Sequence, residues 1–178
     1  MGVMLLRKTV FIVGLAALLG FPGGATAEDV YQQPEEFLAE TFSGDVPAPS
    51  FLWLKKDMRP DINRILQHDG FRGLRVRYWQ DGSRTAWILE EIGKYKPITT
   101  GIVVDEGAIE RIKVLTYRES HGWEVRHDFF TGQFKGLTLD TDYRLSTGID
   151  GIAGATLSVN ALRNLARLAL YFHAIATE

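Results

Sequence analysis

The fold is decided by two alternating segments that meet at a turn, residues 98–117, ITTGIVVDEGAIERIKVLTY. In the second segment Ile112 and Val114 alternate with basic residues, which places apolar and charged side chains on opposite faces of an extended chain. Asp105-Glu106-Gly107 separates the segments and is typical of a hairpin turn. The stretch therefore predicts two antiparallel strands, from Ile98 to Val104 and from Ala108 to Tyr117.

A second hairpin is predicted just upstream. Its first strand alternates two sets of side chains, namely Leu74, Val76 and Tyr78 on one face and Arg75, Arg77 and Trp79 on the other. Asp81-Gly82 supplies a tight turn, and residues 85–90, TAWILE, return along it. We expect the arginine-bearing face to be solvated, and the two hairpins together to give at least four antiparallel strands.

Helices are predicted before and after these strands. One short helix begins at Pro34, and a second begins at Pro60-Asp61 and ends at Gly70. Residues 128–134, DFFTGQF, form either one helical turn or a packed loop, and 144–154 form a glycine-punctuated loop. The clearest helix runs from about Thr156 to Ala174. Its apolar stripe is Leu162, Leu165, Ala169 and Phe172, and its outward residues are Asn160, Arg163, Asn164 and Arg167. The predicted fold class is α+β, an antiparallel sheet with packed helices.

Composition excludes several chemistries. The chain of 178 residues contains no cysteine, so it has no disulfide, thiolate metal site, iron–sulfur cluster or cysteine nucleophile. Residues 1–27 combine Arg7-Lys8, an apolar run of about a dozen residues and the small-residue site ATA, which predicts a signal peptide cleaved near Ala27. The net charge of −2 becomes more negative when this basic segment is removed, which argues against a nucleic-acid partner. We therefore expect a periplasmic or otherwise exported protein.

One loop carries the clearest chemical signal, residues 147–158, TGIDGIAGATLS. Its glycine spacing, G-x-x-G-x-x-G, differs from the dinucleotide fingerprint, and no parallel strand precedes it, so a Rossmann site is excluded. The loop instead delivers hydroxyl residues to the start of a helix, where free N–H groups suit a phosphate. From the residues alone, Thr156 or Ser158 acting as a plain helix cap is an alternative interpretation.

Residues 150–158, DGIAGATLS, fit the pattern D-x-x-[SA]-G-A-T-x-[ST], and in this the chain resembles the FMN-binding domain family. That family includes covalently flavinylated subunits of the sodium-pumping NADH:quinone reductase and of related ion-pumping electron-transport complexes. The similarity extends upstream through residues 91–94, EIGK, and 117–122, YRESHG. The resemblance implies an FMN-binding domain at 70–178, preceded by an N-terminal helical extension at 28–69.

The resemblance also implies the cofactor and its site. In the family the motif threonine is joined through its hydroxyl to the FMN phosphate, which implies covalent FMN on Thr156. The neighbouring cofactor-binding positions are Gly154, Ala155, Leu157 and Ser158, with the Ser158 hydroxyl donating to the phosphate. Asp150 is expected to order the loop, because two anions repel. Glu119, in the upstream turn, is expected to lie near the flavin.

Aromatic side chains are candidates for the flavin-ring walls. Trp123 is the principal candidate for a cofactor-binding position, and Tyr117 and Phe129 are further candidates, with ordinary core packing as the alternative for each. His121 and His127 are interpreted as surface residues, so no metal ligand is assigned. The arginines that interleave with aromatics between residues 72 and 87 are interpreted as a solvated face, with an acidic redox partner as an alternative contact.

The function predicted from these features is an exported electron-transfer flavoprotein that carries FMN on Thr156. It implies an FMN transferase for maturation and a redox partner protein or membrane reductase, and it needs no catalytic acid or base. Two alternatives stay open: an exported non-redox ligand-binding or regulatory module of the same fold, and a reductase that uses non-covalent FMN.

Overall fold

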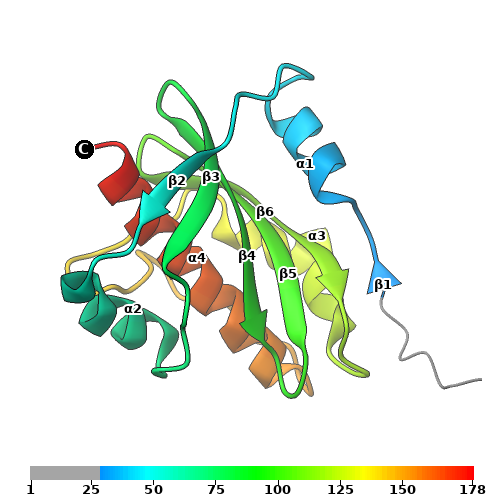
Figure 1. Cartoon of the computed structure of the whole chain (residues 1–178). Helices are drawn as coiled ribbons and strands as arrows, with labels where there is room; N and C mark the ends of the chain where they lie inside the picture. The colour runs from blue at the N-terminus through cyan, green and yellow to red at the C-terminus, as the bar shows by residue number, and fades with distance from the viewer. Residues whose placement is uncertain (1–28) are drawn as a thin grey trace, which may run out of the picture.

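The computed structural model describes residues 29–178, which form one six-stranded antiparallel sheet with helices on both faces (Figure 1). The strand order is β1-β6-β5-β4-β3-β2. The strands are β1 (Asp29–Val30), β2 (Ser50–Trp53), β3 (Arg75–Asp81), β4 (Arg84–Ile92), β5 (Pro97–Asp105) and β6 (Ala108–Tyr117). Both predicted hairpins and the predicted α+β class are confirmed. The predicted signal peptide lies outside the described residues.

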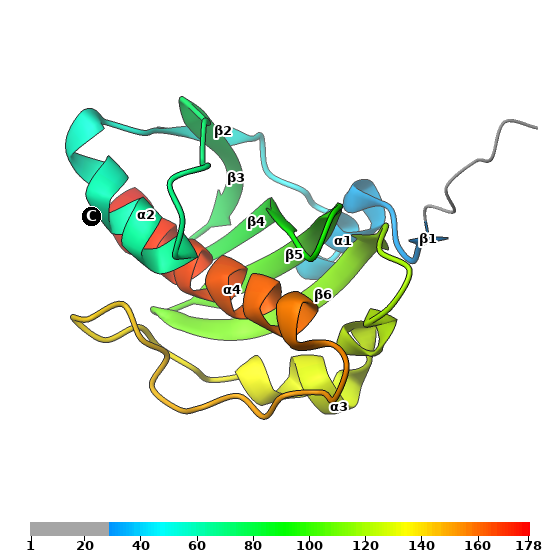
Figure 2. The same cartoon turned by 90° about the horizontal axis from the view of Figure 1, so that it is seen from below.

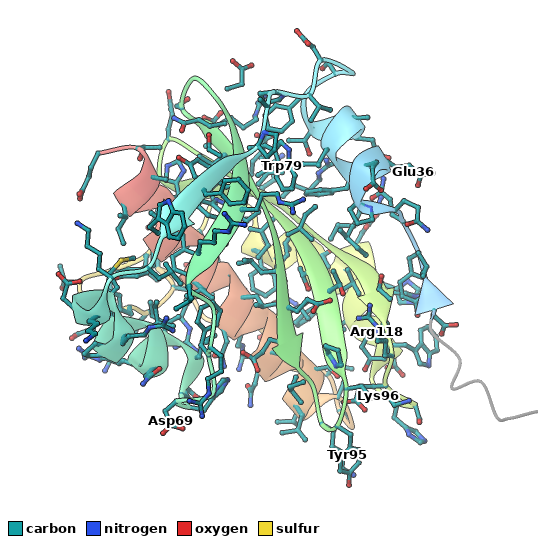
Figure 3. The ribbon with its side chains drawn as sticks, in the orientation of Figure 1. Glu36, Asp69, Trp79, Tyr95, Lys96 and Arg118 are labelled. Atoms are coloured by element: carbon teal, nitrogen blue, oxygen red, sulfur yellow. The ribbon has the colours of Figure 1, made fainter. Side chains whose placement is uncertain are left out.

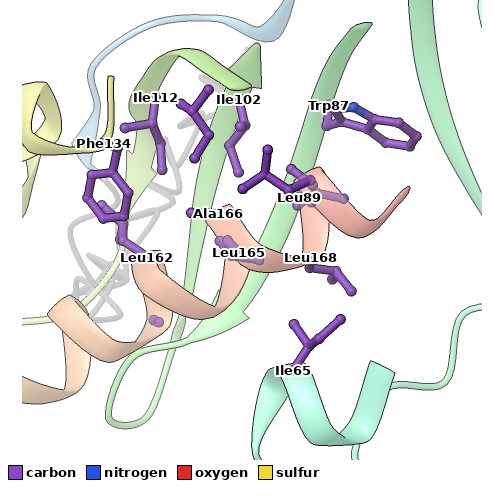
Figure 4. Close-up of a cluster of buried hydrophobic side chains, with 14 of the residues drawn as sticks. Ile65, Trp87, Leu89, Ile102, Ile112, Phe134, Leu162, Leu165, Ala166 and Leu168 are labelled. Atoms are coloured by element: carbon purple, nitrogen blue, oxygen red, sulfur yellow. The ribbon is translucent and has the colours of Figure 1, made fainter. Parts of the chain in front are cut away.

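The long helix α4 (Thr156–Ala176) forms the main layer on one face of the sheet and crosses β4, β5 and β6 (Figure 2). Its predicted apolar stripe is fully buried. Figure 4 shows Leu162 of this helix near Phe134, and Leu168 near Ile65 of the short helix α2 (Arg59–Leu66), within one buried cluster that also contains Leu165. Burial of this stripe against the sheet is the main hydrophobic stabilisation of the domain.

The opposite face of the sheet is covered in part by α1 (Pro34–Thr41), the first predicted helix. Phe37 and Leu38 of α1 form a second buried cluster with Trp79 and Val103. The central strand β5 is therefore buried on both faces, and a Cβ atom at Gly101 would lie only 2.7 Å from the Phe37 ring. Glycine at this position permits the close approach of α1 to the sheet.

The prediction for the face of β3 was wrong in part. Trp79, placed on the solvated face with the arginines, is 8% exposed because α1 covers it. Leu74, placed on the opposite face, is 73% exposed because it precedes the strand. The alternating pattern of side chains identified strand β3, but it did not show that α1 covers part of its second face.

The N-terminal segment contains more than the predicted helices. It also supplies β1 and β2, which pair with β6 and β3 at the two edges of the sheet. Helix α2 ends at Leu66, earlier than the predicted Gly70, because Gln67 adopts a left-handed backbone conformation with φ 63°. Asn164 of α4, predicted to face away, is buried and its Nδ2 donates a hydrogen bond to the Leu66 carbonyl at 2.8 Å.

The chain between β6 and α4 contains only short helical segments. These are a 3-10 helix at Trp123–Arg126, α3 (Asp128–Thr131) and a 3-10 helix at Gly132–Phe134, so the segment DFFTGQF is helical. Phe130 and Phe134 anchor it in the core, and residues 144–154 form the predicted loop that leads into α4. Within residues 29–178, no helix has the length and apolar character needed to span a membrane.

Candidate functional site

A cavity of about 430 Å³ lies where the N-terminus of α4 meets two turns of the sheet. One turn joins β4 to β5, and the other follows β6. The cavity is lined by Lys94, Tyr95, Glu119, Ser120, His121 and residues 154–158. The fold thus brings residues 154–158 and Glu119 to one cavity, although they lie far apart in the chain.

The first turn of α4 is left open to this cavity. Its N-cap residue is Ala155, which forms no side-chain cap, and the first turn contains no acidic residue. The earliest helical hydrogen bond runs from the Val159 N–H to the Ala155 carbonyl, so the three preceding N–H groups have no partner within the helix. These groups and the helix dipole give the end of α4 partial positive charge. Thr156 is exposed and is the first residue of the helix, so it is not the cap.

Ser158 has a different role from the expected phosphate donor. Its side chain is buried, and its Oγ lies 2.8 Å from the Tyr117 hydroxyl, which itself donates to the His121 carbonyl. The single Tyr117 hydrogen is used by His121, so Ser158 must donate to the Tyr117 oxygen. This chain of hydrogen bonds joins α4 to β6 and to the turn that follows β6.

Gly122 completes this attachment. It has φ +88°, and a Cβ atom there would lie 2.9 Å from both the Ser158 Oγ and the Tyr117 hydroxyl. A side chain at this position would therefore be strained and would displace the hydrogen bonds. Burial raises the pKa of Tyr117, in opposition to the hydrogen bond from Ser158, so its hydroxyl stays protonated and keeps donating at neutral pH.

Glu119 organises the opposite wall of the cavity. Its Oε1 accepts hydrogen bonds from the N–H groups of Lys94, Tyr95 and Lys96 at 2.5, 2.5 and 2.8 Å. Partial burial alone would raise the pKa of Glu119, but these three donors hold it below the ordinary value of the group. Glu119 is thus an ionised brace for the β4–β5 turn, and this contact is what places it beside the cavity.

Two other predicted site residues lie outside the cavity lining. Trp123 is 43% exposed, and its ring packs edge-on against His127 at a centroid distance of 5.4 Å. The Asp150 backbone N–H donates to the Gln133 side chain at 2.7 Å, so Gln133 supplies a contact that orders this loop. Of the other aromatic candidates, Tyr117 is core and Phe129 is exposed.

Four residues that line the cavity were not predicted from the sequence as site residues: Lys94, Tyr95, Ser120 and His121. Tyr95 is 75% exposed. Figure 3 shows its side chain at the tip of the β4–β5 turn. The Lys94 Nζ lies 4.8 Å from the centroid of the Tyr95 ring. A tyrosine in the short segment between two predicted strands was the sequence signal that could have identified Tyr95.

Residues 93–171 match the family model of the FMN-binding domain. This segment is an FMN-binding domain. It includes both turns of the cavity and the whole motif at the start of α4. A search of curated proteins gave no match.

The residues of the FMN-binding domain fit FMN. The uncapped end of α4 suits its phosphate, and the exposed surfaces of Tyr95 and Leu157 offer apolar contact area to its ring system. Lys94 supplies one positive charge at the same cavity. Across the described part of the chain, no three potential ligands cluster to hold a metal ion.

Proposed function

We propose that this protein is an exported electron-transfer flavoprotein that carries FMN covalently on Thr156. The observation that carries the proposal is the position of Thr156, an exposed hydroxyl on the first residue of a 21-residue helix whose N-terminus has neither cap nor acid and faces a cavity. When bound, FMN supplies the chemistry of electron acceptance and donation.

Attachment requires the Thr156 oxygen to form a bond to the phosphorus of an activated FMN donor. The hydroxyl loses its proton, and the bond from phosphorus to the leaving group breaks, as in a flavin dinucleotide that releases a nucleoside monophosphate. The N–H groups of the first turn of α4 bind the phosphate oxygens. Because Gly154 and Ala155 precede the threonine, little side-chain bulk obstructs the transferase that performs this step.

The proposed mechanism assigns distinct tasks to the walls of the cavity. Tyr95 and Leu157 cover apolar surface of the ring system, and Lys94 lies where it can balance negative charge. Glu119 holds the turn that presents Lys94 and Tyr95, and the link from Ser158 to Tyr117 holds α4. The chain's residues thus orient the group while a redox partner protein or membrane reductase exchanges electrons with it.

Attachment is tested by coexpression of the chain with an FMN transferase. The expected product is yellow, and its mass rises by that of FMN less one water. Thr156→Ser keeps a hydroxyl and should accept FMN, whereas Thr156→Val keeps the shape but should stay colourless. A yellow Thr156→Val protein with the full mass increase would contradict attachment at this residue.

The cavity assignment has its own control. Tyr95→Ala should blue-shift or broaden the flavin absorption bands of the loaded protein, because it removes the exposed ring beside the motif. Trp123→Ala should leave the spectrum unchanged, since Trp123 lies outside the lining. The reverse pattern would place the ring system against the Trp123 face of the molecule.

A further inference from the structure

A second cavity, of about 350 Å³, lies on the far side of the motif loop, between α4 and residues 144–149. Three arginines line it, Arg144 from the loop and Arg163 and Arg167 from successive turns of α4. All its other lining residues are neutral, and no carboxylate lines it. The residues that line this cavity therefore include three cations and no anion.

The side-chain hydrogen bonds of Arg163 and Arg167 within the described chain go to neutral groups, and the Arg144 backbone N–H donates to the Asp140 side chain at 2.8 Å. Arg163 donates to the Ile149 carbonyl and, at 3.5 Å, to the Asn160 side chain, and Arg167 donates to the Asn164 side chain. Other arginines pair with acids instead, as Arg84 does with Glu110 at 2.7 Å and Arg111 does with Glu40 at 3.2 Å.

Arg167 retains an unused donor. Its Nε is buried and has no hydrogen-bond partner among the described residues. Burial, and secondarily the charge of Arg163, lowers the pKa of Arg167, so the folded protein bears a cost for holding both cations here. A buried guanidinium donor without a partner, beside a second cation, is a feature that a bound anion would satisfy.

We propose that this cavity binds a small oxyanion, a phosphate or a carboxylate, through its three arginines. The guanidinium fork matches both groups, because each presents paired oxygens to two parallel N–H donors. The volume suits inorganic phosphate or a short dicarboxylate. The Asn160 and Asn164 side chains hold the Arg163 and Arg167 guanidinium groups by hydrogen bonds. Both arginines line the cavity in this arrangement.

The position of the site couples it to the motif loop. Arg163 holds the Ile149 carbonyl, and Ile149 is buried seven residues before Thr156. An anion that binds Arg163 therefore binds a residue that also holds the segment leading to the start of α4. The proposal is independent of flavin attachment, because none of its residues lines the Thr156 cavity.

The test is calorimetric titration of the purified protein with sodium phosphate and, separately, with sodium malonate, against sodium chloride at matched ionic strength. Saturable binding of at least one anion is expected, with a raised unfolding midpoint. Phosphate binding alone would identify a phosphate ligand, and malonate binding alone a carboxylate ligand. Failure of both to bind would overturn the proposal.

Matched variants separate this site from general electrostatics and from the open end of α4. Arg144→Gln with Arg167→Gln should weaken binding at least about tenfold. Arg75→Gln with Arg77→Gln removes the same charge from β3, away from this cavity, and should leave binding unchanged. Arg167→Lys keeps the cation but removes the buried Nε, and should weaken binding at least about threefold. Unchanged affinity in the first pair or in Arg167→Lys would refute the site.

Discussion

Replacing Tyr117 with Phe should loosen the attachment of α4 to the sheet, because one hydroxyl serves two partners. The Tyr117 hydroxyl donates to the His121 carbonyl at 2.5 Å and accepts from the Ser158 Oγ at 2.8 Å, in a site where Tyr117 is 1% exposed. A buried hydrogen bond contributes about 1 kcal/mol net to stability, and a group left without a partner costs more. We therefore expect Tyr117→Phe to lower the free energy of unfolding by about 2–3 kcal/mol.

Ser158→Ala removes only one of these bonds. Tyr117 keeps its donation to His121, so the expected cost is about 1 kcal/mol, reduced by the higher helix propensity of alanine. In the double variant, no serine hydroxyl is left unpaired beside the phenylalanine ring. The cost of the double variant should therefore not exceed that of Tyr117→Phe alone, which gives a coupling of about 1 kcal/mol.

The assay is urea unfolding at equilibrium, followed by tryptophan fluorescence and by circular dichroism. The propensity effect cancels in the cycle, because Ser158→Ala appears in both of its arms. Tyr31→Phe is the matched control, since its hydroxyl meets Asp29 at 3.4 Å in an exposed pair, and it should change stability by less than about 0.5 kcal/mol. Additive costs in the cycle, or a Tyr117→Phe cost no greater than that of Tyr31→Phe, would refute the shared-hydroxyl arrangement.

Two further predictions concern the core. His173 is buried, with its Nδ1 2.8 Å from the Thr85 hydroxyl and its Nε2 accepting a hydrogen bond from the Gly107 N–H. Burial lowers the pKa of His173. Its contribution to the free energy of unfolding should therefore be fully present above the ordinary histidine pKa of about 6.5, and should be lost as the pH drops below that value. Urea midpoints between about pH 5 and pH 8 should show this loss in the parent and a flatter profile in His173→Gln, whereas parallel profiles would exclude His173 as its source. Gly101→Ala places a Cβ 2.7 Å from the buried Phe37 ring and should destabilise the protein by about 1–3 kcal/mol. Adding Phe37→Leu should recover part of that loss, and a further loss would show that the ring is not the obstacle.

Prediction from sequence worked best where a pattern reports on one face of one element. The alternation in residues 98–117 and the stripe of α4 each gave the right element, with bounds close to those of the structure. Prediction from sequence failed where a second element, packed on the other face, decides which side chains are buried. Trp79 alternates with core residues, but α1 covers its face, and Asn164 is polar, but it caps the end of α2.

Some residues of the candidate site could be identified from the sequence, and others only from the structure. The motif at 150–158 was identified from the sequence alone because its members are adjacent in the chain. Trp123, close in sequence to Glu119, was predicted as a cofactor-binding residue but does not line the cavity, since it begins a 3-10 helix and its ring packs against His127. Tyr95 belongs to the cavity because strands β5 and β6 bring its turn beside the segment that follows β6.

The sequence by itself determined the α+β class, both hairpins, the long C-terminal helix and the threonine at its start, because periodicity and a contiguous motif are local properties of the chain. Tertiary structure alone decided that Glu119 braces the turn carrying Tyr95, that Ser158 is held by Tyr117, and that three arginines share one cavity. Each of these depends on residues that lie far apart in sequence or on separate turns, and only packing fixes the distance and direction between them.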